Sequence, residues 1–211
     1  MSQCGLRHAM KLIMQNLILA TLTTNAMSDY VGLSFEYEDS GNGLRTMRLY
    51  GNFTASTDQL TAVFADSQSS LYIRSENSFY QNPFGGPTSV SINPALYDLF
   101  PSLEYDSWVT IGSEDQIDNE MLDIGIDWTG FESGGDIESD NGAWFASPDD
   151  VQVLAGNDLR VLAGQFTTYG WDSQINYTTN ESIVDELAPG LERLFLAGFS
   201  TAGTYLVAGN Q

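Results

Sequence analysis

The chain has 211 residues, 42% of them hydrophobic, and its 28 Asp and Glu against 7 Lys and Arg give a formal net charge of −21. This excess of negative charge would repel phosphate groups, so the composition argues against nucleic acid and against anionic membrane surfaces as partners. The hydrophobic fraction is sufficient for one sizeable core.

The N-terminal segment differs from the rest of the chain because it holds no Asp or Glu. A Met-Lys pair at Met10 precedes an apolar stretch over residues 12–22, and small residues precede a cut after Ser28. This layout is typical of a secretory signal peptide. We predict a signal peptide over residues 1–28, starting at Met1 or at Met10, and therefore a secreted, extracellular protein. An amphipathic N-terminal helix is the alternative.

Removal of this segment would take away Cys4, His8 and Lys11, which are the only Cys, His and Lys of the chain. The mature protein would then lack the residues for Ser-His-Asp, Cys-His, Schiff-base and zinc chemistry. Carboxylates, hydroxyls, aromatic rings and the backbone remain. They favour binding of hard cations, hydrolysis by a carboxylate pair, or recognition of sugars and surfaces.

From Asp29 onward the apolar residues recur with a period of two, which is the pattern of half-buried strands. The runs VGLSFEY and LRTMRLYGNF flank a hairpin turn rich in Gly and Asn over residues 38–43. Further strands are predicted at DQLTAVFA, LYIR, YDSWVTIG, MLDIGIDW, AWFA and DLRVLAGQFTT, and the tail LFLAGFSTAGTYLVAG is suited to one or two more. In two of these runs the alternation places apolar residues on one face of the strand. They are Val31, Leu33, Phe35 and Tyr37 in the first run, and Leu122, Ile124, Ile126 and Trp128 in MLDIGIDW.

Helix signals are scarce. INPALYDLFPSL offers Asn93 as an N-cap with Pro94 in the first turn, and NESIVDELAPG is a second candidate. The sequence therefore predicts a mainly β fold, a single-domain antiparallel β-sandwich or jelly roll over residues 29–211 with one or two short helices.

Four blocks carry a resemblance: SFYQNPFGGPTSVSINPALYDLFPSLEYDSWVTIG, IGIDWTGFESGG, WFASPDD and LRVLAGQFTT. In this order they resemble a domain found in secreted proteins of marine and planctomycete-type microbes, and the likeness runs from about Arg45 to Thr168. The resemblance implies secretion and a β-rich fold. It implies no activity, because these extracellular domains are uncharacterised, and the segment after Ile183 departs from their pattern.

The acidic run DIESDNG suggests a metal site. Asp136, Glu138 and Asp140 have the spacing of the first three ligand positions of a calcium loop, and Asn141 and Asp149 would add oxygen ligands. Asn141 stands where an EF-hand requires Gly, so an irregular calcium loop between strands is the form expected. The alternative is a solvated acidic loop, as is common in a chain with so many carboxylates.

The aromatic residues suggest a sugar-binding surface, because sugar rings stack on exposed indoles. Trp108 shares a predicted face with Asp106 and Thr110, and Trp171 stands at a predicted loop tip in YGWDSQ. Core packing is the alternative for each Trp.

A catalytic alternative concerns Asp118 and Glu120. A retaining glycoside hydrolase with E-x-D-x-E on one strand would need an acid at Gln116, and the run is better interpreted as a loop. We therefore assign no catalytic residue. The sequence favours a secreted binding or structural module of the surface, matrix or adhesion type, calcium-stabilised if the acidic run binds metal, with a carbohydrate-binding module and a carboxylate-only glycoside hydrolase as alternatives.

Overall fold

The computed structural model describes residues 30–65, 70–75 and 77–169, and the backbone of residues 191–194, 199–201 and 204–206. The predicted signal peptide, Trp171 and the predicted helix at NESIVDELAPG lie outside the described residues.

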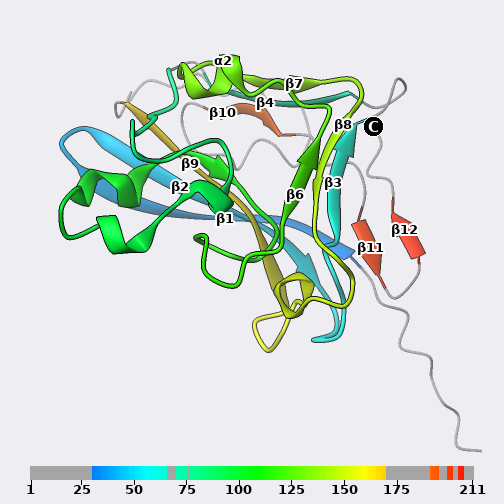
Figure 1. Cartoon of the computed structure of the whole chain (residues 1–211). Helices are drawn as coiled ribbons and strands as arrows, with labels where there is room; N and C mark the ends of the chain where they lie inside the picture. Colours follow the sequence, from blue (N-terminus) through cyan, green and yellow to red (C-terminus); the bar gives the residue numbers. More distant parts are fainter. Residues whose placement is uncertain are drawn as a thin grey trace, which may run out of the picture.

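The fold is mainly β with antiparallel sheets, as predicted, and is consistent with a β-sandwich (Figure 1). A four-stranded sheet has the order β1 (Tyr30–Gly41), β2 (Leu44–Phe53), β9 (Arg160–Tyr169) and β5 (Trp108–Val109). Two three-stranded sheets have the orders β3 (Ala62–Ala65), β8 (Gly142–Phe145), β6 (Leu122–Ile124), and β10 (Leu191–Leu194), β4 (Leu71–Ser75), β7 (Ile137–Ser139). A hairpin pairs β11 (Phe199–Thr201) with β12 (Thr204–Leu206).

Helical structure in the described part of the chain is limited to α2 (Thr129–Glu132) and short 3-10 turns at Ser89–Ser91, Pro94–Leu96, Pro101–Tyr105 and Val151–Val153. No helix of the described residues is long and apolar enough to cross a membrane.

The predicted first hairpin is confirmed. Asn42 and Gly43 form its turn with φ angles of 54° and 78°, a left-handed conformation that Asn and Gly adopt most readily. The predicted face needs one correction: a register shift beside Gly32 turns Val31 outward, where it is 65% exposed. Tyr30 takes the inner side instead, and its ring contacts that of Phe53.

The main core lies where the sheets meet. Met47, Leu49 and Phe166 enter it from the four-stranded sheet, and Val63 and Trp144 enter it from the β3–β8–β6 sheet. Leu71, Ile73 and Ile137 of the third sheet complete this cluster, together with loop residues such as Phe79 and Phe131. Side chains from facing sheets thus interdigitate, as they do in a sandwich.

A second, smaller core covers the opposite face of the four-stranded sheet. Tyr50, Trp108 and Leu162 meet Ile92 and Leu103 there. YDSWVTIG is therefore buried on both faces instead of one.

The helix predicted between Asn93 and Pro101 is instead a single 3-10 turn at Pro94–Leu96, and a second 3-10 turn follows at Pro101–Tyr105. Asn93 is the N-cap, as predicted, and its Oδ1 accepts a hydrogen bond from the Ala95 N–H at 3.1 Å. Pro101 starts the second turn, and the residue before a proline is disfavoured in helical conformation, so no helix continues through Phe100, as the sequence indicated.

Candidate functional site

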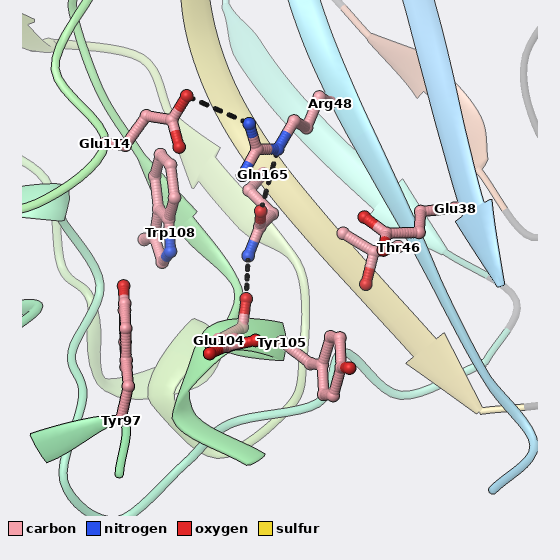
Figure 2. A pocket seen from close by; sticks show the side chains of 9 residues that line it. All are labelled: Glu38, Thr46, Arg48, Tyr97, Glu104, Tyr105, Trp108, Glu114 and Gln165. Atoms are coloured by element: carbon pink, nitrogen blue, oxygen red, sulfur yellow. Dashed lines mark hydrogen bonds and ion pairs between the residues drawn. The ribbon is translucent and has the colours of Figure 1, made fainter. Parts of the chain in front are cut away.

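A hollow of about 180 Å³ lies on the outer side of the four-stranded sheet, between β2, β9 and the 3-10 turns (Figure 2). We call it the sheet pocket. Its lining residues are Glu38, Thr46, Arg48, Tyr97, Glu104, Tyr105, Trp108, Glu114 and Gln165.

A row of residues in register crosses the four strands, and three of them, Arg48, Gln165 and Trp108, line the sheet pocket. Glu36 stands opposite Arg48, Arg48 opposite Gln165, and Gln165 opposite Trp108. Directly opposed residues of antiparallel strands point to the same side of the sheet. Four residues far apart in the sequence are therefore brought side by side on the face away from the main core.

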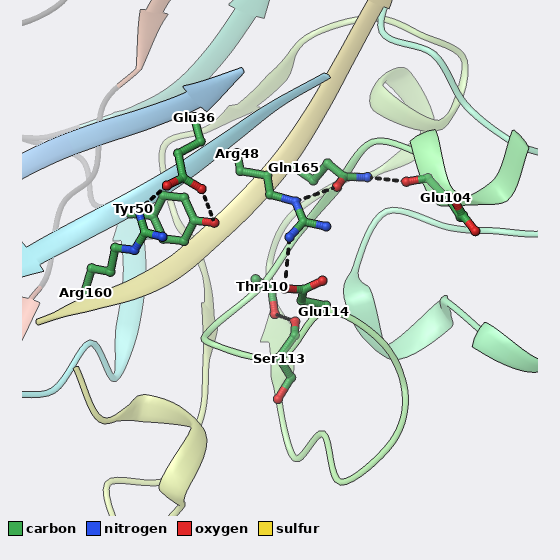
Figure 3. A network of polar contacts seen from close by, with 9 residues as sticks. All are labelled: Glu36, Arg48, Tyr50, Glu104, Thr110, Ser113, Glu114, Arg160 and Gln165. Carbon is green, nitrogen blue, oxygen red and sulfur yellow. Dashed lines mark hydrogen bonds and ion pairs between the residues drawn. The ribbon is translucent and has the colours of Figure 1, made fainter. Parts of the chain in front are cut away.

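A hydrogen-bond network fixes this row (Figure 3). Arg48 donates through Nε to Oε1 of Gln165 at 3.2 Å and pairs through Nη1 with Oε1 of Glu114 at 2.9 Å. Gln165 donates through Nε2 to the carbonyl oxygens of Glu104, at 2.8 Å, and of Asp106, at 2.9 Å. The amide of Gln165 is thus satisfied at both ends by partners from two other segments of the chain, β2 and the stretch from Glu104 to Asp106.

The charge of Arg48 is secured by its surroundings. Burial acts to lower the pKa of Arg48, but the charge of Glu114 and the hydrogen bond to it outweigh burial and raise that pKa above its usual value. A guanidinium held by two partners presents its remaining N–H groups in a fixed direction.

A separate group of polar contacts lies beside this network, toward β1 (Figure 3). Glu36 pairs with Nη1 of Arg160 at 2.6 Å and accepts a hydrogen bond from the Tyr50 hydroxyl at 3.2 Å. The guanidinium of Arg160 lies over the Tyr50 ring, 4.0 Å from its centre. The hydrogen bond from Arg160 lowers the pKa of Glu36, so this carboxylate stays ionised.

Aromatic residues form the wall of the sheet pocket. Tyr97 and Tyr105 come from the 3-10 turns and are half-buried, and burial, assisted by nearby carboxylates, raises the pKa of Tyr97 to about 12. Trp108 also lines the pocket, but it is only 2% exposed. The prediction of Trp108 as an exposed stacking surface is therefore wrong, because the 3-10 turns cover the face that the sequence pattern left open.

Several lining groups remain available to a ligand. Within the described residues, the carboxylates of Glu38 and Glu104 and the hydroxyls of Tyr97 and Tyr105 make no hydrogen bond to another protein group. Arg48 is the one cationic side chain among the lining residues, whereas three are carboxylates. The site therefore offers aromatic rings, hydrogen-bonding groups and net negative charge, which is suited to binding a neutral or cationic polar molecule.

The predicted calcium ligands lie elsewhere, at the sheet that holds β4 and β7. Asp136 and Glu138 are brought together around Arg74, which forms ion pairs with both carboxylates and lies over the Tyr72 ring. Asp140 borders a shallow hollow beside Tyr72 and Arg74. Glu138 lies in the strand β7, so the chain is extended here, with residues two apart separated by about 6.6 Å, and does not form a loop at this point.

The other two predicted ligands are exposed and separate. The backbone N–H of Asn141 donates to Ser139, and that of Asp149 donates to Ser147 in the next loop. No three His, Cys, Asp or Glu side chains gather closely enough to hold a metal ion in the part of the chain that the structure describes. Calcium binding stays a prediction.

Asp118 and Glu120 lie in the exposed loop between β5 and β6, as the sequence indicated, and Asp118 has a φ angle of 50°.

Sequence reasoning missed the polar row of the sheet pocket. Arg48 and Gln165 place long polar side chains in strands that are mostly buried, and that was the available signal. Their meeting depends on the register of β2 with β9, which join residues more than a hundred positions apart.

Comparisons with models of protein families, with curated proteins and with solved structures gave no match to this chain. The resemblance to secreted microbial domains, and the secretion that it implies, therefore stay predictions.

Proposed function

We propose that the chain is a secreted binding module whose sheet pocket holds one residue of a glycan. The observation that carries this proposal is the combination of Tyr97 and Tyr105 with unpaired carboxylates beside the fixed Arg48–Gln165 pair. Sugar rings pack their apolar faces on aromatic rings, and their hydroxyls donate to carboxylates and accept from a guanidinium.

The size of the sheet pocket supports a single-ring ligand. Its volume of about 180 Å³ is below the roughly 300–1,000 Å³ of pockets that enclose drug-sized molecules. One ring of a longer glycan would enter, and the remainder would lie over the surface.

The charge of the pocket lining favours one class of glycan over another. Glu38, Glu104 and Glu114 outnumber Arg48, whose charge is already matched by Glu114. A neutral glycan is therefore favoured over a sulfated or uronic-acid polymer, which the acidic lining would repel.

The test is a glycan array followed by titration calorimetry on the best neutral hit. Glu104→Gln keeps the side chain's size but removes its charge, and Tyr97→Phe removes only the hydroxyl. Each change is expected to weaken binding roughly tenfold, as the loss of a hydrogen bond to a charged or polar group does. Glu132→Gln, at an exposed residue of α2 that does not line the sheet pocket, is the matched control and should bind like the wild type. An array without a neutral hit, or equal affinity in all variants, would refute the proposal.

The extracellular setting and calcium stabilisation belong to the same proposal. The signal-like segment before Asp29 supports export. The carboxylates at Asp136, Glu138 and Asp140 support a cation at the molecular surface, provided that Arg74 gives up its pairing with them.

A further inference from the structure

The face of the β3–β8–β6 sheet that points away from the core is apolar. Register places its residues in two rows across the strands: Ala62, Phe145 and Leu122, then Phe64, Ala143 and Ile124. The alternate residues Val63 and Trp144 are fully buried in the main core, which fixes the direction of this outer face. Leu122 is 62% exposed and Ile124 is 66% exposed.

This composition is unusual for a solvated sheet face. Antiparallel sheets with one face in water normally carry polar residues there. The chain has 28 Asp and Glu, yet the outer face has none of them. An exposed apolar edge strand such as β6 tends to pair with another chain, so natural proteins usually cover such a strand or place charged residues on it. We therefore expect this face to be covered in the functional protein.

The chain itself holds a suitable cover. Residues 195–211 read FLAGFSTAGTYLVAGNQ and contain no Asp, Glu, Lys or Arg. β11 and β12 belong to this segment, and β11 lies beside β3, a strand of the same sheet (Figure 1). We propose that the outer face of the β3–β8–β6 sheet is the docking surface of the chain's own C-terminal segment, residues 195–211.

Tethering favours this segment over a second copy. β10 immediately precedes it and pairs with β4, so the segment starts from a strand attached to the folded domain. A tethered segment reaches its surface at an effective concentration in the roughly millimolar range, above that of a free second molecule in solution.

Cross-linking of the full chain tests the placement. In a Cys4→Ser background, Phe64→Cys is combined with Phe199→Cys, and the control combines Val151→Cys with Phe199→Cys. Val151 is 79% exposed and lies in a 3-10 turn outside the apolar face. Mild oxidation is expected to link the first pair within one molecule and to leave the control pair unlinked. Linkage between molecules would indicate a second copy as the occupant, and equal linkage of both pairs would indicate no preferred site; either result overturns the proposal.

Hydrogen exchange provides an independent readout. Leu122→Ser with Ile124→Ser is expected to speed amide exchange in residues 195–211 roughly tenfold, because docking that loses apolar contacts opens more often. Val151→Ser should leave that segment unchanged, and unaltered exchange in β2 and β9 would show that the fold is intact. Equal exchange of residues 195–211 in both variants would overturn the proposal.

Discussion

Replacing Asp106 should change how the unfolding free energy of the protein depends on pH. Its side chain is fully buried just before β5, where Oδ1 accepts from the Asn82 N–H at 2.6 Å and Oδ2 from the Gly86 N–H at 3.0 Å. Burial raises the pKa of Asp106 to about 7, although the backbone hydrogen bonds from Asn82, Gly86 and Ser107 act in the opposite direction. The carboxyl is thus held by a tight loop in which a Cβ at Gly85 would lie 1.7 Å from Oδ2.

The direction of the pH dependence follows from proton binding. An unfolded Asp releases its proton near pH 3.9, whereas the folded Asp106 retains it to about pH 7. Between these values the folded state binds more protons, so stability is highest at low pH and falls as pH rises through the folded pKa. The difference between the unfolded pKa of about 3.9 and the folded pKa of about 7 corresponds to about 4 kcal/mol of unfolding free energy, of which about 3 kcal/mol should be lost between pH 5 and pH 8.

The assay is urea unfolding followed by Trp fluorescence at several pH values from 5 to 8 and constant ionic strength. The window is favourable because the chain has one His, His8, and ordinary carboxyls are already ionised at pH 5. Asp106→Asn cannot titrate, so its unfolding free energy should be nearly flat across the window. At pH 5 it should be lower than that of the wild type by about 1–3 kcal/mol, because one backbone N–H loses its acceptor.

A matched variant separates this effect from the loss of any buried carboxyl. Asp58 is only 1% exposed, and its Oδ2 accepts from the Ala55 N–H at 3.0 Å. Asp58→Asn retains Asp106 and should therefore keep the wild-type slope with pH. A wild-type stability that is flat or rises from pH 5 to pH 8, or an unchanged slope in Asp106→Asn, would refute the reasoning.

Three further outcomes are expected. Gly112→Ala should lower the unfolding free energy by at least about 2 kcal/mol in urea titrations. Gly112 has a φ of 76°, and an added Cβ would lie 1.8 Å from the Gln152 carbonyl oxygen. An unchanged urea midpoint would contradict this prediction. If the acidic run binds calcium, millimolar calcium added after EDTA should raise the melting temperature by several degrees, because a ligand that binds the folded state stabilises it. Asp136→Ala combined with Asp140→Ala should abolish that rise. A rise no larger than the one produced by matched ionic strength would show that the acidic run is a solvated surface and not a calcium site. Expression with a secretory host should yield a product whose N-terminus follows Ser28, by mass spectrometry of the medium, whereas an uncleaved intracellular chain would contradict the signal peptide.

The sequence predicted the elements of the fold better than their environment. Period-two alternation located the first hairpin and most later strands, because side-chain alternation is a local property of a strand. It predicted exposure poorly where tertiary packing decides. Trp108 and Thr110 are buried because the 3-10 turns cover a face that the sequence pattern left open. Leu122 and Ile124 are exposed because they lie on the face of their sheet that points away from the main core.

The candidate site was harder to predict for the same reason. The acidic run and the Trp residues were the candidates that the sequence indicated, because each can be recognised within a short stretch and carries groups that bind ligands. The sheet pocket instead depends on register: Arg48 meets Gln165 only through the pairing of β2 with β9, and Tyr97 reaches them only because the 3-10 turns fold over the sheet. Neither relation is encoded in a short motif.

The Arg48–Gln165 pair, half-buried at Arg48 and buried at Gln165, is the strongest reason to look for function at the sheet pocket. Placing Arg48 and Gln165 at the middle of a central sheet costs desolvation, and their hydrogen bonds mainly offset that cost. Apolar residues of similar volume would pack against Tyr50 and Trp108 at least as well for stability alone. Positions that depart from the local apolar pattern while keeping every polar group satisfied are typical of functional sites. The same face of the same sheet also carries the free carboxylates and Tyr hydroxyls, so the network and the available groups serve one surface.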